Sequence, residues 1–422
     1  MKLSKYTIFH KQNDNVYIYN QISMALLEID NELYDILKQG NMNIVHNDVM
    51  KVLRDNGFIV NNNVNESDKI CYANMKNRYN SKFMRITILP TLNCNFKCWY
   101  CYEQHKVSSL SEKNAESILT FIKYEVESRH IETVALDWFG GEPLMRFKQT
   151  VYPLSEKLME WCIKRDIHFI NMITTNGSLI DEKMARRMND INLRQFQITL
   201  DGGKEMHNKV KFSSLMKNSY DVIIKNIHTL CRNIDDVNIE LRINYTHDNI
   251  DSALEVLTSF DDDIKCHILI SPHIVWQESK YAEGLLEKVD LLKEKAFEMG
   301  FSVRNSDLQP RCTACYTDNM EQFVINYDLN VYKCTARDFD KKNSIGKIDD
   351  DGNFLPNDLY YKFYITSSPF MRERCLDCNL LPTCLYSSSC LQKKIEGYRP
   401  ECNKEAVMAS LKKSLSLKIK RL

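Results

Sequence analysis

The sequence has no excess of charge of either sign and no long apolar stretch. Lysine plus arginine and aspartate plus glutamate both total 56 in 422 residues, so the formal net charge is zero. That balance argues against nucleic acid as a partner, because a phosphate-binding surface needs an excess of basic side chains. No run approaches the roughly 18 apolar residues of a transmembrane helix, and the N-terminal apolar run is too short for a signal peptide. We therefore expect a cytoplasmic protein with no membrane partner.

Cysteine is the unusual component. The chain has 15 cysteines, although it is long enough to bury a core without disulfides. In a reducing compartment, clustered cysteines more often bind metal or carry out redox chemistry. Two clusters stand out, one of Cys94, Cys98 and Cys101 and one of Cys312, Cys315, Cys334, Cys375, Cys378, Cys384, Cys390 and Cys402. The scattered Cys71, Cys162, Cys231 and Cys266 are predicted to be small buried apolar residues.

Residues 1–75 are predicted to form a winged-helix-like module. Short β-rich runs on both sides of a polar turn indicate a hairpin, and helical spacing follows, with Asp30 placed to cap the first helix and Gly40 to end it. The predicted elements are strands at residues 6–10 and 16–19, a helix ending before Gly40, a helix at 46–54, a strand at 58–60 and a polar linker at 61–69.

From residue 84 the pattern changes to alternating strands and helices. Apolar runs begin near Arg85, Val134, His168, Gln195, Val237 and Cys266. Six such units predict an α/β fold with a parallel sheet and outer helices, either open or curved into a partial barrel. Ligands of such sheets bind at the carboxyl ends of the strands, and the motifs described below lie at those ends. We assign this sheet to residues 84–304.

The rest of the chain is predicted to have a different character. Residues 305–410 are rich in loops and cysteines, which is typical of a small domain folded around metal. Residues 411–422 form a basic tail, which we interpret as the solvated end of a helix.

The spacing Cys94-x3-Cys98-x2-Cys101 directly follows the first predicted strand. Three thiolates on a short loop can hold three corners of a metal site and leave the fourth open. A zinc site would need a nearby fourth protein ligand, for which His105 is available. An iron–sulfur cluster would instead leave one iron free for a ligand that is not protein.

The loop CNFKCWYCYE, followed by WFGGEPL, TTNG, ITLDGG and RINYT, resembles the radical S-adenosylmethionine (SAM) superfamily. The later cysteines resemble its SPASM peptide-maturase branch, and the resemblance covers about residues 84–405. It implies a partial (β/α)6 barrel in which the three loop cysteines hold a 4Fe–4S cluster, with SAM chelating the unique iron. An electron from a flavodoxin- or ferredoxin-type donor would then cleave SAM, giving a 5′-deoxyadenosyl radical that abstracts a substrate hydrogen.

The resemblance also assigns roles around the cofactor. The ring of Tyr100 would lie against the adenine, two glycines would expose carbonyls to a ligand ammonium, and a carboxylate would lie nearby. Polar residues after the third to fifth strands suit the ribose hydroxyls, the methionine carboxylate and the adenosine. The assigned residues are Tyr100, Gly140, Gly141, Glu142, Asn176, Thr199, Asp201 and Asn244.

Two further residues lie in this region. Lys211 stands where relatives often carry arginine, whose planar fork could bind a carboxylate with two parallel hydrogen bonds. His207 is predicted to be structural or to support the site. Spacing alone identifies no catalytic acid or base.

The later cysteines resemble the SPASM signature, which implies two auxiliary 4Fe–4S clusters in addition to the SAM-binding one. Two departures are visible: five residues precede Cys390 where relatives usually have three, and Leu329 replaces a glycine. Two structural zinc sites are the alternative. By resemblance, the first cluster is held by Cys312, Cys315, Cys334 and Cys390, and the second by Cys375, Cys378, Cys384 and Cys402.

Three functions remain open, and a peptide maturase is favoured. Residues 1–75 resemble the element with which such enzymes hold the leader of a ribosomally made precursor peptide, by adding a strand to a sheet edge. Its expected chemistry is hydrogen abstraction followed by oxidative closure of a thioether or carbon–carbon crosslink.

The second function is that of a sulfatase-maturating enzyme, which oxidises Cys or Ser to formylglycine. Such enzymes usually begin close to the cluster loop and carry aspartate after the cysteine matching Cys334, whereas here 93 residues precede Cys94 and Thr335 follows Cys334. The third is a non-catalytic iron–sulfur electron carrier, which has no use for the GGEP and ribose-site residues.

Overall fold

The computed structural model describes residues 1–80, 82–213, 216–275, 277–278, 284–304, 308, 310, 315–336, 339–365, 373–384 and 402–420. The chain divides into two compact units. The terminal unit comprises Met1–Asn80, Asn305–Met320 and Lys362–Leu422, and the sheet unit comprises Ser81–Arg304 and Glu321–Tyr361. None of the helices in the described ranges combines the length and the apolar character needed to cross a bilayer.

All six strands predicted from the apolar runs are present in the sheet unit. They lie in sequence order and each pairs in parallel with the next. The strands are β6 (Phe83–Leu89), β7 (Thr133–Trp138), β8 (His168–Thr175), β9 (Leu193–Leu200), β10 (Asn238–Tyr245) and β11 (Ile268–Ile274). The prediction of an α/β fold with a parallel core is therefore confirmed.

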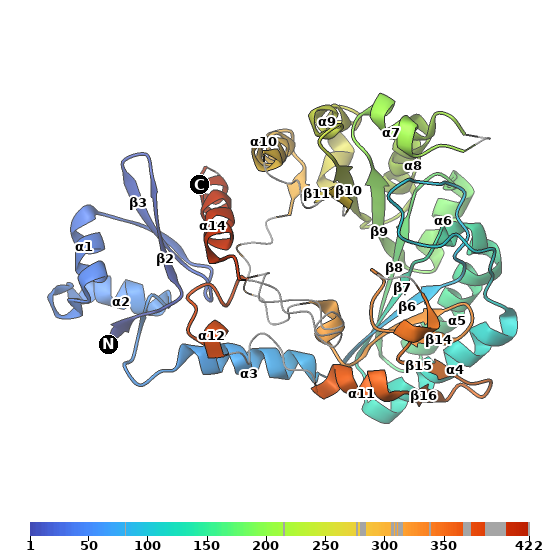
Figure 1. Cartoon of the computed structure of the whole chain (residues 1–422), viewed down its shortest axis with the longest axis horizontal. Coiled ribbons are helices and arrows are strands. Elements are labelled where there is room, and N and C mark those ends of the chain that lie inside the picture. Colours follow the sequence, from blue (N-terminus) through green and yellow to red (C-terminus); the bar gives the residue numbers. More distant parts are fainter. Residues whose placement is uncertain are drawn as a thin grey trace. The chain divides into compact units, whose positions relative to one another are not determined.

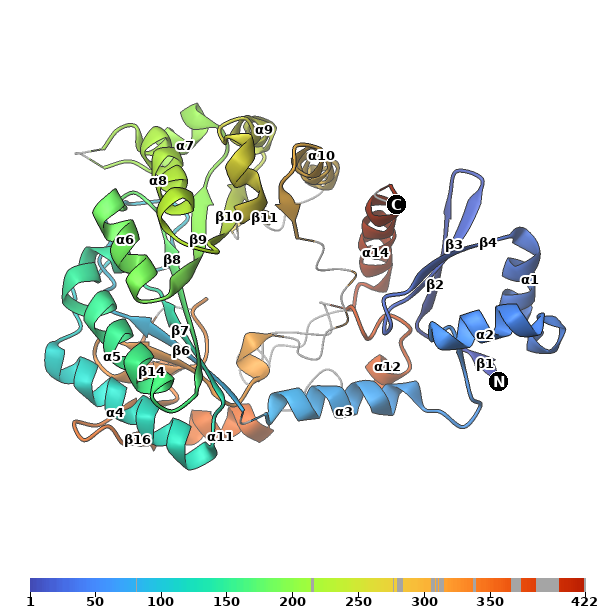
Figure 2. The same cartoon turned by 180° about the vertical axis from the view of Figure 1, so that it is seen from behind.

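Helices follow the outer side of this sheet (Figures 1 and 2). They are α4 (Glu112–Arg129), α5 (Tyr152–Ile163), α6 (Glu182–Asp190), α7 (Lys204–Val210), α8 (Ser219–Asn233), α9 (Ala253–Leu257) and α10 (Leu285–Glu298). Ser111 and Asp181 cap α4 and α6 by accepting backbone N–H bonds, as their positions before the helices predict. Trp138 of β7 is fully buried and donates its indole N–H to Ser155 of α5 at 3.1 Å, which fixes the helix-facing side of that strand.

Short strands extend this sheet at both edges. They are β12 (Ser302–Val303) at one edge and β13 (Gln322–Asn326), β14 (Asn330–Tyr332), β15 (Gly346–Ile348) and β16 (Phe354–Pro356) at the other. β13 pairs in parallel with β6, and β14 to β16 continue antiparallel. The described sheet is therefore mixed and has eleven strands. Leu329, in the turn from β13 to β14, has φ +65°, a left-handed conformation that explains why the family pattern has glycine there.

The N-terminal part of the terminal unit contains the predicted hairpin and both predicted helices. Its elements are β1 (Lys2–Leu3), β2 (Thr7–Gln12), β3 (Asn15–Asn20), β4 (Leu26–Ile29), α1 (Asn31–Gln39), α2 (Asn47–Asp55), β5 (Ile59–Val60) and α3 (Glu66–Arg78). Asp30 caps α1, and Gly40 ends it with φ +76°, so both predicted signals are confirmed. β2, β3 and β4 form an antiparallel sheet, while β1 pairs with β5.

The prediction of a linker at residues 61–69 is wrong at its C-terminal end. Helix α3 begins at Glu66, and Asn65 caps it by accepting the N–H of Ser67. The first turn of the helix is polar, so its start carried no apolar signal, but Ile70 and Asn74 are buried on one face.

Residues near the two ends of the chain share an apolar core in the terminal unit. Helices α11 (Asp358–Ile365), α12 (Glu373–Leu376) and α14 (Lys404–Ile419) complete the described elements. Ile8 and Tyr19 pack with Leu380, Leu411 and Leu415. The basic tail is the end of a helix, as predicted, but it is not solvated on every side. Helix α14 crosses residue 411 without a break and buries Leu411 and Leu415.

Candidate active site

The loop that carries Cys94, Cys98 and Cys101 follows β6 and is closed at its base. The Thr91 hydroxyl donates to the Ser108 carbonyl at 2.7 Å, and the Leu92 N–H donates to the Ser108 hydroxyl at 2.8 Å. The Leu110 N–H also bonds the Pro90 carbonyl at 2.8 Å. These bonds fix both ends of the loop where β6 ends and α4 begins.

The three loop thiols lie in surroundings that oppose negative charge. Burial raises the pKa of Cys94 to about 12, and the Glu142 carboxylate and the other two thiols act in the same direction. Burial likewise raises the pKa of Cys101 to about 11. Thiolates here need a compensating cation, which an iron–sulfur cluster supplies. The donor set thus fits the predicted cluster.

The thiols are not already gathered around one point. In the described part of the chain, no three His, Cys, Asp or Glu side chains form a group able to hold a metal ion. Nε2 of His105 lies 3.3 Å from Sγ of Cys101, so the candidate fourth zinc ligand contacts one cysteine. Ligand sets of this kind commonly close around the metal as it binds.

The glycine pair after β7 lies directly against the start of the cysteine loop. The Gly141 N–H bonds the Thr91 carbonyl at 3.1 Å, and the Glu142 N–H bonds the Asn93 carbonyl at 2.9 Å. A Cβ on Gly140 or Gly141 would overlap these carbonyl oxygens, and Gly140 also has φ +113°. The glycines therefore let the backbone after β7 touch the backbone at the start of the cysteine loop. The sequence predicted only that they would expose carbonyl groups to a ligand.

Glu142 connects the glycine loop to the end of β8. Its carboxylate is fully buried and accepts from the Leu144 N–H at 2.9 Å, the Thr175 hydroxyl at 2.8 Å and the Asn176 N–H at 2.8 Å. Burial raises its pKa to about 7 against these donors. The side chain thus holds two cofactor-site loops together, and its contact with a ligand ammonium stays a prediction.

Asn176 joins β8 to the cysteine loop. Its Nδ2 donates to the side chain of Asn95 at 2.8 Å and lies 3.9 Å from Sγ of Cys94. Its Oδ1 accepts the Ser178 N–H at 2.9 Å. The structure therefore brings Asn176 beside the first cysteine, while its predicted ribose contact is untested.

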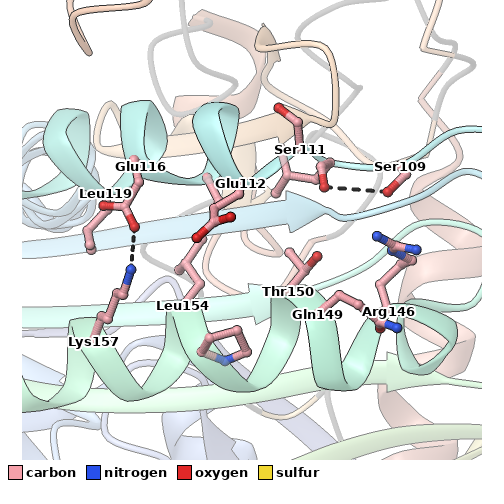
Figure 3. A pocket seen from close by; sticks show the side chains of 13 residues that line it. Ser109, Ser111, Glu112, Glu116, Leu119, Arg146, Gln149, Thr150, Leu154 and Lys157 are labelled. Atoms are coloured by element: carbon pink, nitrogen blue, oxygen red, sulfur yellow. Dashed lines mark hydrogen bonds and ion pairs between the residues drawn. The ribbon is translucent and has the colours of Figure 1, made fainter.

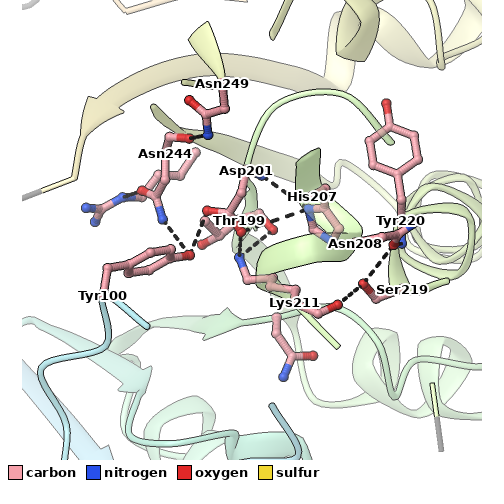
Figure 4. A network of polar contacts seen from close by, with 12 residues as sticks. Tyr100, Thr199, Asp201, His207, Asn208, Lys211, Ser219, Tyr220, Asn244 and Asn249 are labelled. Carbon is pink, nitrogen blue, oxygen red and sulfur yellow. Dashed lines mark hydrogen bonds and ion pairs between the residues drawn. The ribbon is translucent and has the colours of Figure 1, made fainter. Parts of the chain in front are cut away.

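A polar network joins the cysteine loop to the ends of β9 and β10 (Figure 4). The Tyr100 hydroxyl donates to Asp201 at 2.7 Å and accepts from Asn244 at 3.0 Å. Lys211 pairs with Asp201 at 2.9 Å and donates to the Thr199 carbonyl at 3.1 Å. The predicted residues Tyr100, Thr199, Asp201 and Asn244 thus come together, with Lys211 as the cation among them.

The carboxylate of Asp201 is held in its ionised form. Burial alone would raise its pKa, but the Lys211 ammonium and the hydrogen bonds from Tyr100 and Lys211 hold that pKa below its ordinary value. Asp201 and Lys211 are both almost completely buried. Lys211 is thus occupied by a protein carboxylate in this structure.

His207 contacts this network through the backbone of Asp201. Its Nδ1 accepts the backbone N–H of Asp201 at 3.1 Å, and the ring is fully buried. Burial and the nearby Lys211 ammonium lower its pKa to about 3. The ring is therefore neutral near pH 7, with its proton on Nε2, and it fixes the backbone of Asp201. This arrangement agrees with the supporting role expected from the sequence.

Charged residues on the opposite side of the strands were missed by the sequence reasoning. Asp137 alternates with the helix-facing Leu136 and Trp138, so it points to the face away from α5. Burial raises its pKa to about 6. Arg242 of β10 donates to the Asn244 side chain at 2.9 Å. The sequence signal that could have identified them is a charged residue at alternate positions of an apolar strand, which places its side chain on the face opposite the helices.

The cavity in Figure 3 lies elsewhere. It has a volume of about 530 Å³ and is lined by residues of α4 and α5 and of the segments before them. Glu116 and Lys157 form an ion pair at its rim. None of the residues predicted to bind the cofactor lines this cavity, so we do not place the active site there.

The structure describes six of the eight later cysteines. Cys312 and Cys390 lie outside the described residues, so the predicted ligand set of the first auxiliary cluster stays a prediction. Cys375, Cys378 and Cys384 are partly buried in the terminal unit, whereas Cys402 is exposed. Cys378 and Cys384 pack against the core formed by Ile8, Tyr19, Leu308, Leu380, Leu411 and Leu415.

Comparison with known proteins adds a family and several relatives. Residues 88–260 match the Radical SAM superfamily. The chain is 22% identical to the radical SAM cyclopropyl synthase TigE of Paramaledivibacter caminithermalis, over 92% of this chain and 89% of that protein. It is 26% identical to a cysteine-type anaerobic sulfatase-maturating enzyme of Clostridium novyi, over 81% of this chain and 96% of that protein.

Solved structures share the fold. The structure of native anSMEcpe with bound AdoMet aligns with 80% of this chain and 97% of its own, at 19% identity and a TM-score of 0.58. Streptococcus suis SuiB bound to precursor peptide SuiA aligns with 96% of this chain and 99% of its own, at 15% identity and a TM-score of 0.52.

Proposed function

Residues 88–260 of this chain match the Radical SAM superfamily, and from that match we propose that the protein is an enzyme that modifies a ribosomally made precursor peptide. In the proposed reaction it cleaves SAM reductively and takes a hydrogen atom from the peptide. An oxidative thioether or carbon–carbon crosslink would then close as a second hydrogen leaves as a proton and its electron passes to an auxiliary cluster. The family implies a 4Fe–4S cluster and SAM. Two auxiliary clusters and a flavodoxin- or ferredoxin-type electron donor are further parts of the proposal.

The residues of the site have distinct roles in this proposal. Cys94, Cys98 and Cys101 would hold the cluster, which together with SAM supplies the 5′-deoxyadenosyl radical. Tyr100 is oriented by its two hydrogen bonds, which leaves its ring to lie against the adenine. Glu142 holds the glycine loop against the end of β8, so that these loops present fixed polar groups to the methionine end of SAM.

The observation that supports a peptide substrate is how far the structural match to SuiB extends along the chain, beyond residues 88–260. The likeness to SuiB extends over 96% of this chain, and that structure contains a precursor peptide. The likeness to anSMEcpe extends over only 80%. The longer match to SuiB supports an N-terminal peptide-binding element shared with that protein.

We propose that a leader peptide adds a strand to the three-stranded sheet of the terminal unit. In the described structure β3 is the central strand of this sheet, and β2 and β4 are its edges. An edge strand offers unpaired backbone groups to an extended peptide, and this provides affinity independent of the reacting residue. In this proposal, residues 1–75 are the winged-helix-like module that recognises the leader by adding it as a strand.

Sulfatase maturation is the second candidate, because the C. novyi enzyme is 26% identical over 81% of the chain. That reaction needs a Cys or Ser peptide and gives formylglycine. Thr335, which follows Cys334 where those enzymes usually have aspartate, favours the peptide maturase.

The deciding experiment supplies the reduced holoenzyme with SAM and either a precursor peptide encoded beside this protein or a sulfatase-derived Cys peptide. We expect the precursor to lose about two mass units as one crosslink forms, with 5′-deoxyadenosine released alongside. A precursor without its leader should react much more slowly. Formylglycine in the sulfatase peptide, with an unmodified precursor, would contradict the proposal.

A further inference from the structure

Helix α3 lies against the loop that joins Cys375 to Cys378. The Ser67 hydroxyl donates to the Leu376 carbonyl at 2.8 Å, and the Lys5 ammonium donates to the same carbonyl at 2.6 Å. Both views show α12, which contains Cys375, beside α3 (Figures 1 and 2). The Cys-x2-Cys loop is therefore docked on the first turns of α3.

Cys71 belongs to the face of α3 that carries this loop. It follows Ser67 by four residues, and side chains four apart on a helix are neighbours on one face. Cys71 and Cys375 both pack against the buried cluster of Tyr6, Ile70 and Leu381. Cys71, which was predicted from the sequence to be an ordinary buried residue, thus lies at a predicted metal-binding loop.

The other thiols of this loop region are in the same unit. Cys378 and Cys384 pack on the adjoining core that contains Tyr19 and Leu380. Like Cys71 and Cys375, they are partly shielded from solvent. Cys402, the fourth ligand expected from the resemblance, is exposed. Shielding matters because solvent exposure and hydrogen bonding set the potential of an iron–sulfur cluster.

We propose that Cys71 is the fourth thiolate ligand of the cluster held by Cys375, Cys378 and Cys384, in the place expected for Cys402. This inference rests on the proposed function, because it assumes that the second auxiliary cluster exists. The four thiols do not yet converge in the described structure. The same is true of Cys94, Cys98 and Cys101, so convergence on metal binding is expected for both sets.

The test compares Cys71→Ala with Cys402→Ala in the full-length, anaerobically reconstituted holoenzyme. Cys162→Ala is the matched control, because Cys162 is a fully buried thiol of α5 in the sheet unit. Iron and sulfide per chain are measured, with the electron paramagnetic resonance spectrum of the reduced protein. Three 4Fe–4S clusters contain about twelve iron atoms, so we expect Cys71→Ala to lose about one third of them. Cys402→Ala and the control should keep their iron.

Retained iron and an unchanged spectrum in Cys71→Ala, with a loss in Cys402→Ala, would overturn the inference. A second measurement tests the inference on the unmutated protein, so that it does not depend on whether the variants fold. In the native holoenzyme, alkylation followed by mass spectrometry should show Cys71 protected and Cys402 reactive. Removing iron with a chelator should make Cys71 reactive. Equal reactivity of Cys71 before and after chelation would also overturn it.

The proposed function and this inference fail in different ways. If wild-type protein contains only about four iron atoms per chain, the auxiliary clusters are absent and the premise is wrong. If it contains about twelve and Cys71→Ala retains them, the peptide chemistry stands and only the role of Cys71 is refuted.

Discussion

Gly141→Ala should dislodge the cysteine loop, although it adds a single methyl group. A Cβ at this position would lie 2.5 Å from the carbonyl oxygen of Leu92 and closer still to that of Asn93. Real Cβ contacts essentially never fall below 3.0 Å. The backbones must therefore separate by at least about 0.5 Å, because neither obstacle is the tip of a flexible side chain.

The loss in free energy of unfolding follows from the backbone hydrogen bonds that this separation weakens. The N–H groups of Gly141 and Glu142 bond the carbonyls of Thr91 and Asn93 across this contact. Overpacking costs about 1–3 kcal/mol, and each weakened backbone bond adds about 0.5–1.5 kcal/mol. We expect a destabilisation of roughly 2–6 kcal/mol and a fall in Tm of roughly 5–15 °C, with loss of iron from the Cys94 loop.

Gly203→Ala is the matched control for this prediction. Neither Gly141 nor Gly203 has a positive φ, and an added Cβ would also meet a close neighbour at Gly203. The nearest atoms belong to the carboxylate end of Glu255, which can rotate away. The Ser252 carbonyl oxygen lies at 3.0 Å, which is tight but outside the range that real Cβ contacts avoid. Melting curves and iron content of the two reconstituted variants are compared with wild type. If Gly141→Ala melts like Gly203→Ala and keeps its iron, the close contact between the two loops is not what holds the site.

Three further results are expected. Replacing Cys94, Cys98 and Cys101 together with alanine should remove one cluster's iron and abolish SAM cleavage; 5′-deoxyadenosine at the wild-type rate would exclude the radical mechanism. Glu142→Ala should weaken SAM binding by roughly 1.5–3 kcal/mol, the value of a charged hydrogen bond, and lower Tm even without cofactor; wild-type values in calorimetry and melting would remove it from the site. The pKa of His207 is about 3 in the folded protein, below its ordinary 6.5, so its contribution to stability is complete above pH 6.5 and is lost as pH falls towards 3. Between pH 7 and 5, urea titration should show wild type losing about 2 kcal/mol more than His207→Gln; parallel losses would contradict a neutral, buried ring.

The core of the sheet was predictable because its signals are local. Each of the six strands is an apolar run with helical sequence after it, and Ser111 and Asp181 cap two of the helices that follow. The cysteine and glycine motifs follow strands, so their common edge could be inferred before any contact was known. The strands β12 to β16 were not found, because strands of two to five residues depend on their partners for stability.

Helix α3 shows where local sequence signals fail to predict structure. Its polar first turn was predicted to belong to a linker, but capping by Asn65 and burial of Ile70 and Asn74 make this segment a helix in its tertiary setting. Helix propensity and pattern are weak when packing supplies the stability. The same tertiary contacts bring Cys71 and Cys375, which are about 300 positions apart in sequence, to one buried apolar cluster.

The sequence by itself determined the parallel sheet, the edge at which its motifs meet and the set of thiols available to iron, because each depends on residue type and spacing. The tertiary structure decided how those motifs touch. Only there do the glycines become the contact between two loops, and only there does Glu142 become the link to β8. Close packing and hydrogen bonding between distant segments depend on the position of every element at once, and no local pattern records them.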